Sequence, residues 1–435
     1  MNQSKEQIIY PRLLESVLRH KLNLFGAVVV EGPKQSGKTY LCEQVAKSKF
    51  YVQKRHQMIQ LDLSLNNTDK ILNGSKPRLI DEWQIESRIW DLVRFKIDQA
   101  KGQKGLYILT GSSNQAYQEV YHSGAGRFAW LQLQTLTFYE LLSKQSQQKF
   151  VSLQALFEQK SITFSASKVK NEWTIKQMLK GDWPEINQPE TQNYSQEIIS
   201  SYLKAITNVT KDNQFSELKI NPLFIKPFIK SLVWLNAKQI GVDTIANNLE
   251  LDLKPAQIKH YLLYLQSMFI CFELQIWNHT LGLIKRQRLR VKPKHYLCDP
   301  SILFNVLNLH TVEKILEQTE ILGYAFENQV IKDLTVYVQN LNGQLSFYRD
   351  ENGLEVDAII ELNNGQWAAI EIKWNGTQKN LAKAIKTLQR FNNKMINLGL
   401  TKPAFMAIIV LNNEINRPYQ RADGIYVIPH VCLGP

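Results

Sequence analysis

The residues from 32 to 39 combine two glycines, a lysine and a threonine in an order suited to binding phosphate. The segment follows an apolar run at 27–31 and reads Gly32-Pro33-Lys34-Gln35-Ser36-Gly37-Lys38-Thr39. Phosphate binding needs glycines that let backbone N–H groups approach the anion, together with one cation and one hydroxyl. Lys38 supplies a cation for the β- and γ-phosphates, and Thr39 supplies a hydroxyl ligand for Mg²⁺. The spacing therefore predicts a loop that binds ATP with Mg²⁺.

Two adjacent acids lie at the end of a second apolar stretch. Asp81 is the last residue of the stretch, and Glu82 follows it directly. In nucleotide hydrolases the first carboxylate orients hydrated magnesium and the second polarises the attacking water. We therefore expect Asp81 to bind the cofactor and Glu82 to be catalytic. A polar turn after the apolar run 106–109 either contacts the γ-phosphate or the water, or is only a turn. Its residues are Thr110, Ser112, Ser113 and Asn114.

A second set of acids lies near the end of the chain, at Asp357 and Glu371, with Lys373 two residues beyond Glu371 and Glu327 on an earlier helical segment. Two acids can hold Mg²⁺ against a phosphodiester while a lysine steadies the developing charge or orients water. The spacing of Glu371 and Lys373 places both on one face of a strand. The pattern predicts Asp357 and Glu371 as metal ligands and, with Lys373, as catalytic residues. Alternatively, Lys373 neutralises the acids in a structural ion network.

The first third of the chain alternates short apolar runs with helical patterns. Strands are expected at 27–31, 58–63, 78–81, 106–111 and 128–133, with a helix over 38–49. This α/β alternation predicts a parallel sheet covered by helices. Residues 143–160 are rich in Gln, Ser and Lys and are expected to form a surface excursion or helical linker. A helical region over 172–310 and a mixed region over 320–435, with a hairpin at 350–353, follow.

The helical region contains spacing typical of a helix-turn-helix, with segments at 242–249 and 254–265. Ile258, Tyr261, Leu262 and Leu265 would face inward. A strand pair near 270–277 and 294–298 would form a wing. This strand pair contains the densest basic run, made of Lys285, Arg286, Arg288, Arg290, Lys292 and Lys294. The module is predicted to contact DNA, or else to serve as a lid or a protein-contact domain.

Composition limits the class of protein. At 435 residues the chain has room for about three domains. The formal net charge of +13 favours a polyanionic partner such as nucleic acid. Residues 1–9 lack the pattern of a signal peptide, no apolar run is long enough to span a membrane, and the four cysteines form no C-x-x-C pair. We therefore expect a cytoplasmic protein without membrane insertion.

Motifs along most of the chain carry a resemblance to a known family. They include Tyr10-Pro11-Arg12, the phosphate loop, Leu79-Ile80-Asp81-Glu82-Trp83-Gln84, Leu136-Thr137-Phe138-Tyr139-Glu140, Gly181-Asp182-Trp183-Pro184-Glu185, Glu355-Val356-Asp357 and Glu371-Ile372-Lys373. The chain resembles AAA-type P-loop ATPases of bacteria and archaea that carry a C-terminal domain of unknown function with a restriction-endonuclease-like, PD-(D/E)XK core.

The resemblance also has departures. Lys34 stands where the family commonly has Arg, Ser36 where it has Val, and Gly124 begins a segment that usually reads Leu-Ala-Gly-Arg. Neither loop change should abolish phosphate binding. The arginine of that segment, Arg127, is the best candidate for a cation acting on the γ-phosphate, in cis or from a neighbouring copy in a homo-oligomer, with Arg94 as the alternative.

The resemblance and the residues together predict four units. These are a P-loop AAA-type ATPase domain at 1–145, a helical linker or lid at 146–215, a winged-helix-like module at 216–312 and a restriction-endonuclease-like domain at 313–435. The expected function is a Mg²⁺-dependent ATPase that acts as a nucleotide-driven switch on a DNA-associated protein. An ATP-gated, metal-dependent DNA nuclease and a non-enzymatic, nucleotide-sensing scaffold for protein partners are the alternatives.

Overall fold

The computed structural model describes residues 8–53, 69–112, 124–145, 148–170, 172–207, 220–239, 253–278, 292–411 and 414–435, together with 241, 244, 245 and 247. Several predictions fall outside this part of the chain. They concern the strand at 58–63, most of the helix at 242–249, Ser113, Asn114, and the basic residues Lys285, Arg286, Arg288 and Arg290.

The first domain is a five-stranded parallel sheet with the order β2-β3-β4-β1-β5. Its strands are β1 (Ala27–Glu31), β2 (Ser48–Tyr51), β3 (Arg78–Asp81), β4 (Tyr107–Gly111) and β5 (Phe128–Gln132). Its helices are α1 (Glu15–Leu24), α2 (Lys38–Val45), the short α4 (Asp69–Leu72) and α5 (Arg88–Gln99). The α/β prediction is thus confirmed for this domain, but the predicted helix 38–49 is too long, because the chain turns into β2 at Ser48.

Alternation along β1 explains why helices cover both faces of this sheet. Val28 and Val30 are buried in the same cluster as α1 and α2, whereas Ala27 and Val29 are buried with α5. A strand that is apolar on both faces must be covered on both, as is typical of parallel sheets. The phosphate loop follows β1 and therefore lies at the carboxyl edge of a buried strand.

The middle of the chain is mainly helical. Its helices are α6 (Phe138–Gln145), α7 (Leu153–Phe157), α8 (Trp173–Lys180), α9 (Ser195–Thr207), α10 (Pro222–Trp234), α12 (Pro255–Ser267), α13 (Ser301–Val306) and α14 (Val312–Glu317). The strands β7 (Cys271–Leu274) and β8 (Lys294–Leu297) form the antiparallel pair expected for a wing. Ile258, Tyr261 and Leu265 of α12 are buried as predicted, and Leu262 is half-buried. The second helix and the strand pair are therefore present.

The segment expected to be a surface linker is instead part of the core. Its strand β6 (Val151–Ser152) pairs in parallel with β15 (Leu433–Gly434), close to the last residue of the chain. Leu153, Leu156 and Phe157 are buried. The prediction of a surface excursion at 143–160 was wrong. The segment has apolar residues at helical spacing among its Gln, Ser and Lys residues, and these apolar side chains are buried.

The last domain is a six-stranded mixed sheet with the order β13-β14-β12-β11-β10-β9. Its strands are β9 (Gly343–Arg349), β10 (Glu355–Leu362), β11 (Trp367–Lys373), β12 (Phe405–Val410), β13 (Tyr419–Gln420) and β14 (Tyr426–Pro429). The helix α15 (Thr319–Asn340) is buried with one face of the sheet, and α16 (Gln378–Asn397) is buried with the other. The predicted hairpin at 350–353 connects β9 to β10, which are antiparallel.

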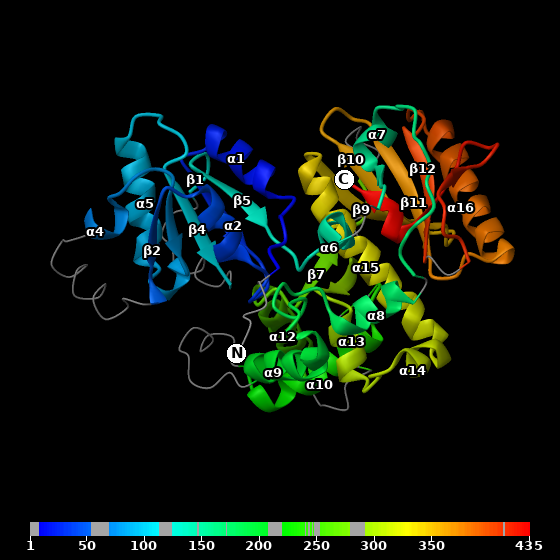
Figure 1. Cartoon of the computed structure of the whole chain (residues 1–435), viewed down its shortest axis with the longest axis horizontal. Coiled ribbons are helices and arrows are strands. Elements are labelled where there is room, and N and C mark those ends of the chain that lie inside the picture. Colours follow the sequence, from blue (N-terminus) through cyan, green and yellow to red (C-terminus); the bar gives the residue numbers. More distant parts are fainter. Residues whose placement is uncertain are drawn as a thin grey trace, which may run out of the picture.

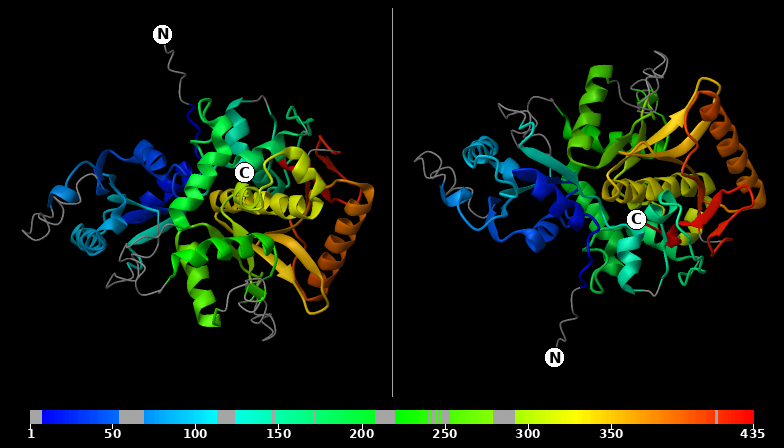
Figure 2. Two further views of the ribbon diagram at one scale, coloured as in Figure 1. Left: turned by 90° about the horizontal axis from the view of Figure 1, so that it is seen from below. Right: turned by 90° about the horizontal axis from the view of Figure 1, so that it is seen from above.

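Figures 1 and 2 show the arrangement of these parts. The parallel sheet lies at one end of the molecule, the mixed sheet at the other, and the middle helices between and below them in Figure 1. Short 3₁₀ turns occur at Trp83–Ile85, Gln192–Tyr194 and His430–Cys432. Within the described residues, no helix has the length and apolarity needed to cross a lipid bilayer.

One buried ion cluster, centred on Lys332 of α15, joins these parts. Its ammonium lies 2.5 Å from Asp182 and 3.4 Å from Asp333, and it donates to the carbonyl oxygen of Leu136 at 2.8 Å. Asp333 also accepts from the backbone N–H of Phe138 and lies 3.2 Å from His430 Nε2. Burial raises the pKa of Asp182 to about 7, against the attraction of Lys332. Buried charges of this kind must be mutually paired.

The first prediction concerns this cluster. Replacing Lys332 by Met should lower the free energy of unfolding by about 3 to 5 kcal/mol, because two buried carboxylates lose their shared cation. Urea unfolding followed by tryptophan fluorescence measures the change. Lys314→Met, on the exposed surface of α14, is the matched control and should shift stability by less than about 0.5 kcal/mol. Equal stability of the two variants would contradict a stabilising role for the cluster.

Candidate functional site

The phosphate loop joins β1 to α2, and its glycines are required by its shape. Gly32 has φ 148°, and a Cβ there would lie 2.1 Å from the carbonyl oxygen of Leu133. Gly37 has φ 89° and immediately precedes the first residue of α2. Side chains are strained at such angles, so glycine is needed at both positions. The loop therefore ends at a helix N-terminus, where backbone N–H groups can bind an anion.

Lys38 lies inside this loop. Its ammonium donates to the carbonyl oxygens of Gly32 at 2.9 Å and Pro33 at 2.7 Å. Burial lowers the pKa of Lys38 to about 8, although Glu82 and Asp81 act in the opposite direction. A buried cation that donates to carbonyl oxygens would gain strongly from a phosphate charge. The position of Lys38 thus fits its predicted role.

Thr39 and Asp81 meet at the carboxyl edge of the sheet. The Thr39 hydroxyl donates to Asp81 Oδ1 at 2.7 Å, and the hydroxyl of Thr110 donates to the same oxygen at 2.6 Å. Asp81 ends β3, and Thr110 lies on the adjacent β4. A hydroxyl and a carboxylate oxygen in contact beside a phosphate loop are the ligand types that Mg²⁺ takes. The donor set fits a magnesium ion held by these two residues.

Glu82 lies beside this pair in a strained turn. It has φ 57°, in the left-handed region that non-glycine residues rarely adopt. Its backbone N–H donates to the Thr110 hydroxyl at 3.1 Å. Its carboxylate accepts from the Ser112 hydroxyl at 3.1 Å and from the side-chain amide of Gln84. The strain and the donors together fix the carboxylate next to the loop.

Sequence reasoning identified some of these neighbours and missed others. Thr110 and Ser112 were expected near the γ-phosphate or the water, and they contact the two acids. The contact of Gln84 with the Glu82 carboxylate was not predicted, although Gln84 follows Glu82 by only two residues in the sequence. Arg12 was noted only within a motif, yet its guanidinium donates to the carbonyl oxygens of Ser36 and Gln134.

The outer side of the loop is held by residues far away in the sequence. Arg12 also pairs with Glu140 at 3.0 Å, and both side chains are almost fully buried. The indole N–H of Trp183 donates to the carbonyl oxygen of Lys34 at 3.2 Å. These donors engage the loop carbonyl groups of Lys34 and Ser36 from outside.

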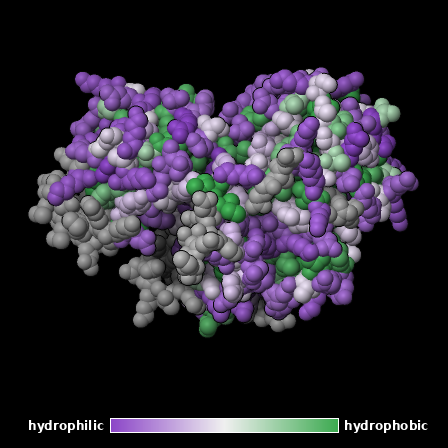
Figure 3. Space-filling view, in the orientation of Figure 1, coloured by the Kyte–Doolittle hydropathy of each residue, from purple (hydrophilic) through white to green (hydrophobic). Residues whose placement is uncertain are grey.

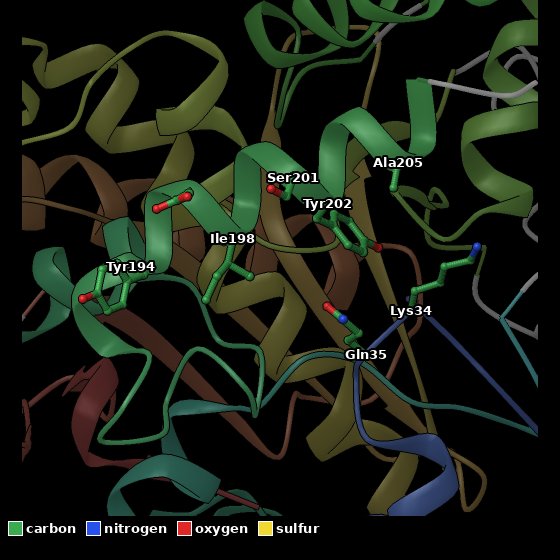
Figure 4. A pocket seen from close by; sticks show the side chains of 8 residues that line it. Lys34, Gln35, Tyr194, Ile198, Ser201, Tyr202 and Ala205 are labelled. Carbon is green, nitrogen blue, oxygen red and sulfur yellow. The ribbon is translucent and has the colours of Figure 1, made fainter.

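A cavity adjoins the loop on the side of α9. It has a volume of about 660 Å³ and is lined by Lys34, Gln35, Tyr194, Glu197, Ile198, Ser201, Tyr202 and Ala205. Figure 4 shows the Lys34 and Gln35 side chains extending from the loop toward α9. The phosphate loop thus shares a cavity with the helical middle of the chain.

Arg127 is not beside its own phosphate loop. It immediately precedes β5, whose first residue Phe128 is in register with Ala27, the first residue of β1. Its guanidinium pairs with Asp98 at 2.6 Å. Because the loop follows the opposite end of β1, Arg127 lies at the other edge of the sheet. Arg94 pairs with Asp91 and Asp98. The geometry contradicts the role expected of Arg127 in cis, and its role in a neighbouring copy stays a prediction.

The C-terminal acids come together as expected. Asp357 on β10 and Glu371 on β11 lie on neighbouring antiparallel strands. Lys373 is 2.8 Å from Glu371 and 3.1 Å from Asp357. Burial, followed by repulsion from Asp357, raises the pKa of Glu371 to about 8. Lys373 thus partly neutralises both acids.

A second lysine, not predicted to lie here, also enters the cluster. Lys294 of β8 is 2.7 Å from Glu355, 3.1 Å from Glu327 and 4.0 Å from Asp357, and its side chain is almost fully buried. The three acids raise the pKa of Lys294 although burial opposes this. Sequence reasoning had assigned Lys294 to the exposed basic run. Within the described residues no group of three or more His, Cys, Asp or Glu side chains is arranged to hold a metal ion.

Three family models match separate parts of the chain. Residues 25–142 match a AAA domain, residues 171–313 match a domain of unknown function (DUF8612), and residues 322–433 match another (DUF4143). A search among curated proteins found no significant match. Residues 25–142 therefore form a AAA domain of the P-loop ATPase class, in agreement with the parallel sheet and the phosphate loop. It is followed by a DUF8612 and a DUF4143 domain.

Solved structures share only a distant likeness. A Walker-type ATPase of Pyrococcus abyssi has 10% identity and a TM-score of 0.41, with 71% of this chain and 98% of that chain covered. A RuvB variant of Thermotoga maritima has 13% identity and a TM-score of 0.26, with 60% and 88% covered. Drosophila ORC bound to DNA has 11% identity and a TM-score of 0.24, with 70% and 88% covered. These values are too low to support an argument about function.

The second prediction tests the role of Thr110 in positioning the two acids. Thr110→Val keeps the shape of the side chain but removes the hydroxyl that contacts Asp81 and Glu82. Lost hydrogen bonds to charged groups should slow ATP turnover about ten- to hundredfold. Binding of an ATP analogue, held through Lys38, should change less than threefold, which is about 0.7 kcal/mol.

Thr335→Val is a control, because its hydroxyl bonds only within α15. If Thr110→Val turns over ATP as fast as the control, Thr110 has no role in positioning the two acids for hydrolysis.

Proposed function

We propose that this chain is a Mg²⁺-dependent ATPase that acts as a nucleotide-driven switch on a DNA-associated protein. The observation that carries the enzymatic part is the contact of Thr39 with Asp81 next to the buried Lys38. Thr39 and Asp81 would hold Mg²⁺, which supplies charge neutralisation for phosphoryl transfer when it is bound. Gly32, Gly37 and the rest of the loop would hold the phosphates.

The remaining steps belong to residues of the chain itself. Lys38 would stabilise charge on the β- and γ-phosphates. Glu82 would accept a proton from, or orient, the attacking water. Ser112 and Gln84 would hold its carboxylate in place, and the Thr110 hydroxyl would hold its backbone N–H. A preorganised carboxylate loses little energy to reorientation during the reaction.

The contacts on the outer side of the loop support the switch. Trp183 bonds the loop at Lys34, and the adjacent Asp182 pairs with Lys332 on α15. The same helix carries Glu327 at the C-terminal acid cluster. A movement of the phosphate loop on ATP binding would therefore act on α15 through two consecutive residues. Such coupling requires that the two nucleotide states differ in these contacts.

DNA as the partner is supported by the charge of +13 and by the predicted basic wing. The proposal includes the four units expected from the sequence, a cytoplasmic location and a homo-oligomer in which Arg127 could reach a neighbouring loop.

An ATP-gated nuclease is a second candidate. It is favoured by the contacts of Lys373 with both Asp357 and Glu371. The resemblance assigns these residues to a PD-(D/E)XK core. A metal ion between Asp357 and Glu371 would take the place of the Lys373 ammonium and would be repelled by Lys294, which lies 4.0 Å from Asp357. A nucleotide-sensing scaffold is the third candidate, and it differs from the others by binding ATP without turnover.

The third prediction concerns ATP turnover. Lys38→Ala should weaken ATP binding at least tenfold, because the buried cation on the phosphates is lost. Glu82→Gln should keep binding but slow turnover about hundredfold or more, because the water loses its base. Binding is measured with a fluorescent ATP analogue and turnover by phosphate release, with DNA integrity followed in the same tube with and without Mg²⁺.

Lys47→Ala serves as the control for loss of a lysine, because Lys47 is exposed between α2 and β2 and lies outside the phosphate loop. Undiminished turnover by purified Glu82→Gln would exclude that residue from the mechanism, and tight binding without turnover by the wild type would favour the scaffold.

The fourth prediction separates the nuclease from an ion network. If Asp357 and Glu371 bind metal, calorimetry without ATP should detect Mn²⁺ binding by the full chain at about millimolar concentration, and Lys294→Gln should strengthen it by removing a competing cation. Asp357→Asn should abolish this binding and any DNA cleavage while leaving ATP turnover intact. If neither the wild type nor Lys294→Gln binds Mn²⁺, the cluster is a structural ion network and not a metal site.

A further inference from the structure

The outer face of α16 carries a row of basic side chains that the proposed ATPase does not use. The helix spans Gln378–Asn397 and contains five basic residues and no acidic one. Four of the basic residues are exposed and form the row: Lys379, Lys383, Lys386 and Arg390. With 3.6 residues per turn, the intervals of four, three and four place them within about 60° of one another around the axis. We call this row the α16 stripe.

The opposite side of α16 is fixed against the mixed sheet. Leu381, Ala384, Leu388, Phe391 and Met395 are all buried there. The stripe is therefore held on a rigid helix and faces solvent along its length. In Figure 3, hydrophilic residues gather at the end of the molecule where Figure 1 places α16.

The four cations of the stripe form no ion pair with any described residue. The nearby acids are engaged elsewhere: Asp350 pairs with Lys394 at 2.6 Å, and Asp423 pairs with Arg421 at 3.2 Å. Surface lysines usually lie close to acids of opposite sign, which limits the local field. The stripe instead concentrates positive potential on one face.

We propose that the α16 stripe is a docking surface for the phosphate backbone of duplex DNA. The stripe is about 16 Å long, close to the axial rise of about 17 Å over five successive nucleotide steps of one DNA strand. Phosphate contacts of this kind give affinity without reading sequence. The choice of DNA rests on the function proposed above, and this inference adds the surface.

A membrane surface is the less favoured partner of the same charge. Helices that lie on membranes bury an apolar face among the lipids. The apolar face of α16 is already buried against β10, β11 and β12 of its own sheet, so only the cations remain for contact. The stripe also starts just after β11, the strand that carries Glu371 and Lys373. DNA on the stripe would thus pass close to the acid cluster.

The test compares two variants of the full chain that lose the same charge. In the first, Lys379, Lys383, Lys386 and Arg390 are all replaced by Gln. In the control, four exposed lysines outside both the C-terminal domain and the predicted DNA-contacting module are replaced by Gln, namely Lys47, Lys101, Lys104 and Lys144. Affinity for a fluorescent duplex of about 20 base pairs is measured by anisotropy over a range of salt concentrations.

The stripe variant should bind the duplex at least tenfold more weakly. Its plot of log affinity against log salt should be flatter by about 2 to 4, because each phosphate contact contributes about 0.9 to the slope. The control should lose less than threefold, about 0.7 kcal/mol, and keep the slope.

The inference is overturned by equal losses in both variants, by unchanged affinity of the stripe variant, or by a wild type that binds no duplex. Stripe-dependent binding to vesicles with about 30% phosphatidylserine, stronger than binding to duplex, would assign the surface to a membrane instead. ATP turnover without DNA should be unchanged in both variants. A failure of turnover in the wild type would overturn the ATPase and leave the DNA measurement to decide the stripe.

Discussion

The ammonium of Lys332 is the contact on which the arrangement of the whole chain depends. One buried cation engages Asp182 in the helical middle, Asp333 on its own helix and the carbonyl oxygen of Leu136 just after the parallel sheet. Buried charges tolerate few alternative geometries, because an unpaired member would cost several kcal/mol. The cluster therefore holds the nucleotide-binding domain, the middle helices and the C-terminal domain in one defined arrangement.

The same cluster gives the phosphate loop an outside contact. Asp182 and Trp183 are consecutive, so the residue that pairs with Lys332 is adjacent to the residue that bonds the loop at Lys34. On the inner side, Lys38, Thr39 and Asp81 are the residues proposed to hold phosphate and magnesium. A ligand that changes the inner side has a short physical route to α15, and α15 reaches the acid cluster through Glu327. This route is the structural basis for proposing a switch.

The sequence predicted the parts of the molecule that local rules determine. The glycines at 32 and 37, the lysine and the threonine specify the loop, and the buried runs specify four of the five strands of the first sheet. Contacts between distant segments could not be predicted, because periodicity says nothing about partners. Lys294 was assigned to a basic run. It lies 33 residues before Glu327 in the sequence, yet its ammonium contacts Glu327 and Glu355. Likewise, the pairing of β6 with β15 joins segments 282 residues apart.

Hydrogen–deuterium exchange with and without Mg²⁺ and ATP tests the central claim most directly. The Glu82→Gln variant, expected to bind without turnover, keeps the nucleotide in place during labelling. ATP should change the exchange of the turn at 181–187 and of α15 as well as of the phosphate loop. In Lys332→Met the change should remain at the loop and disappear from α15. A response confined to residues 25–142 in the Glu82→Gln protein would contradict coupling between the nucleotide site and the C-terminal domain.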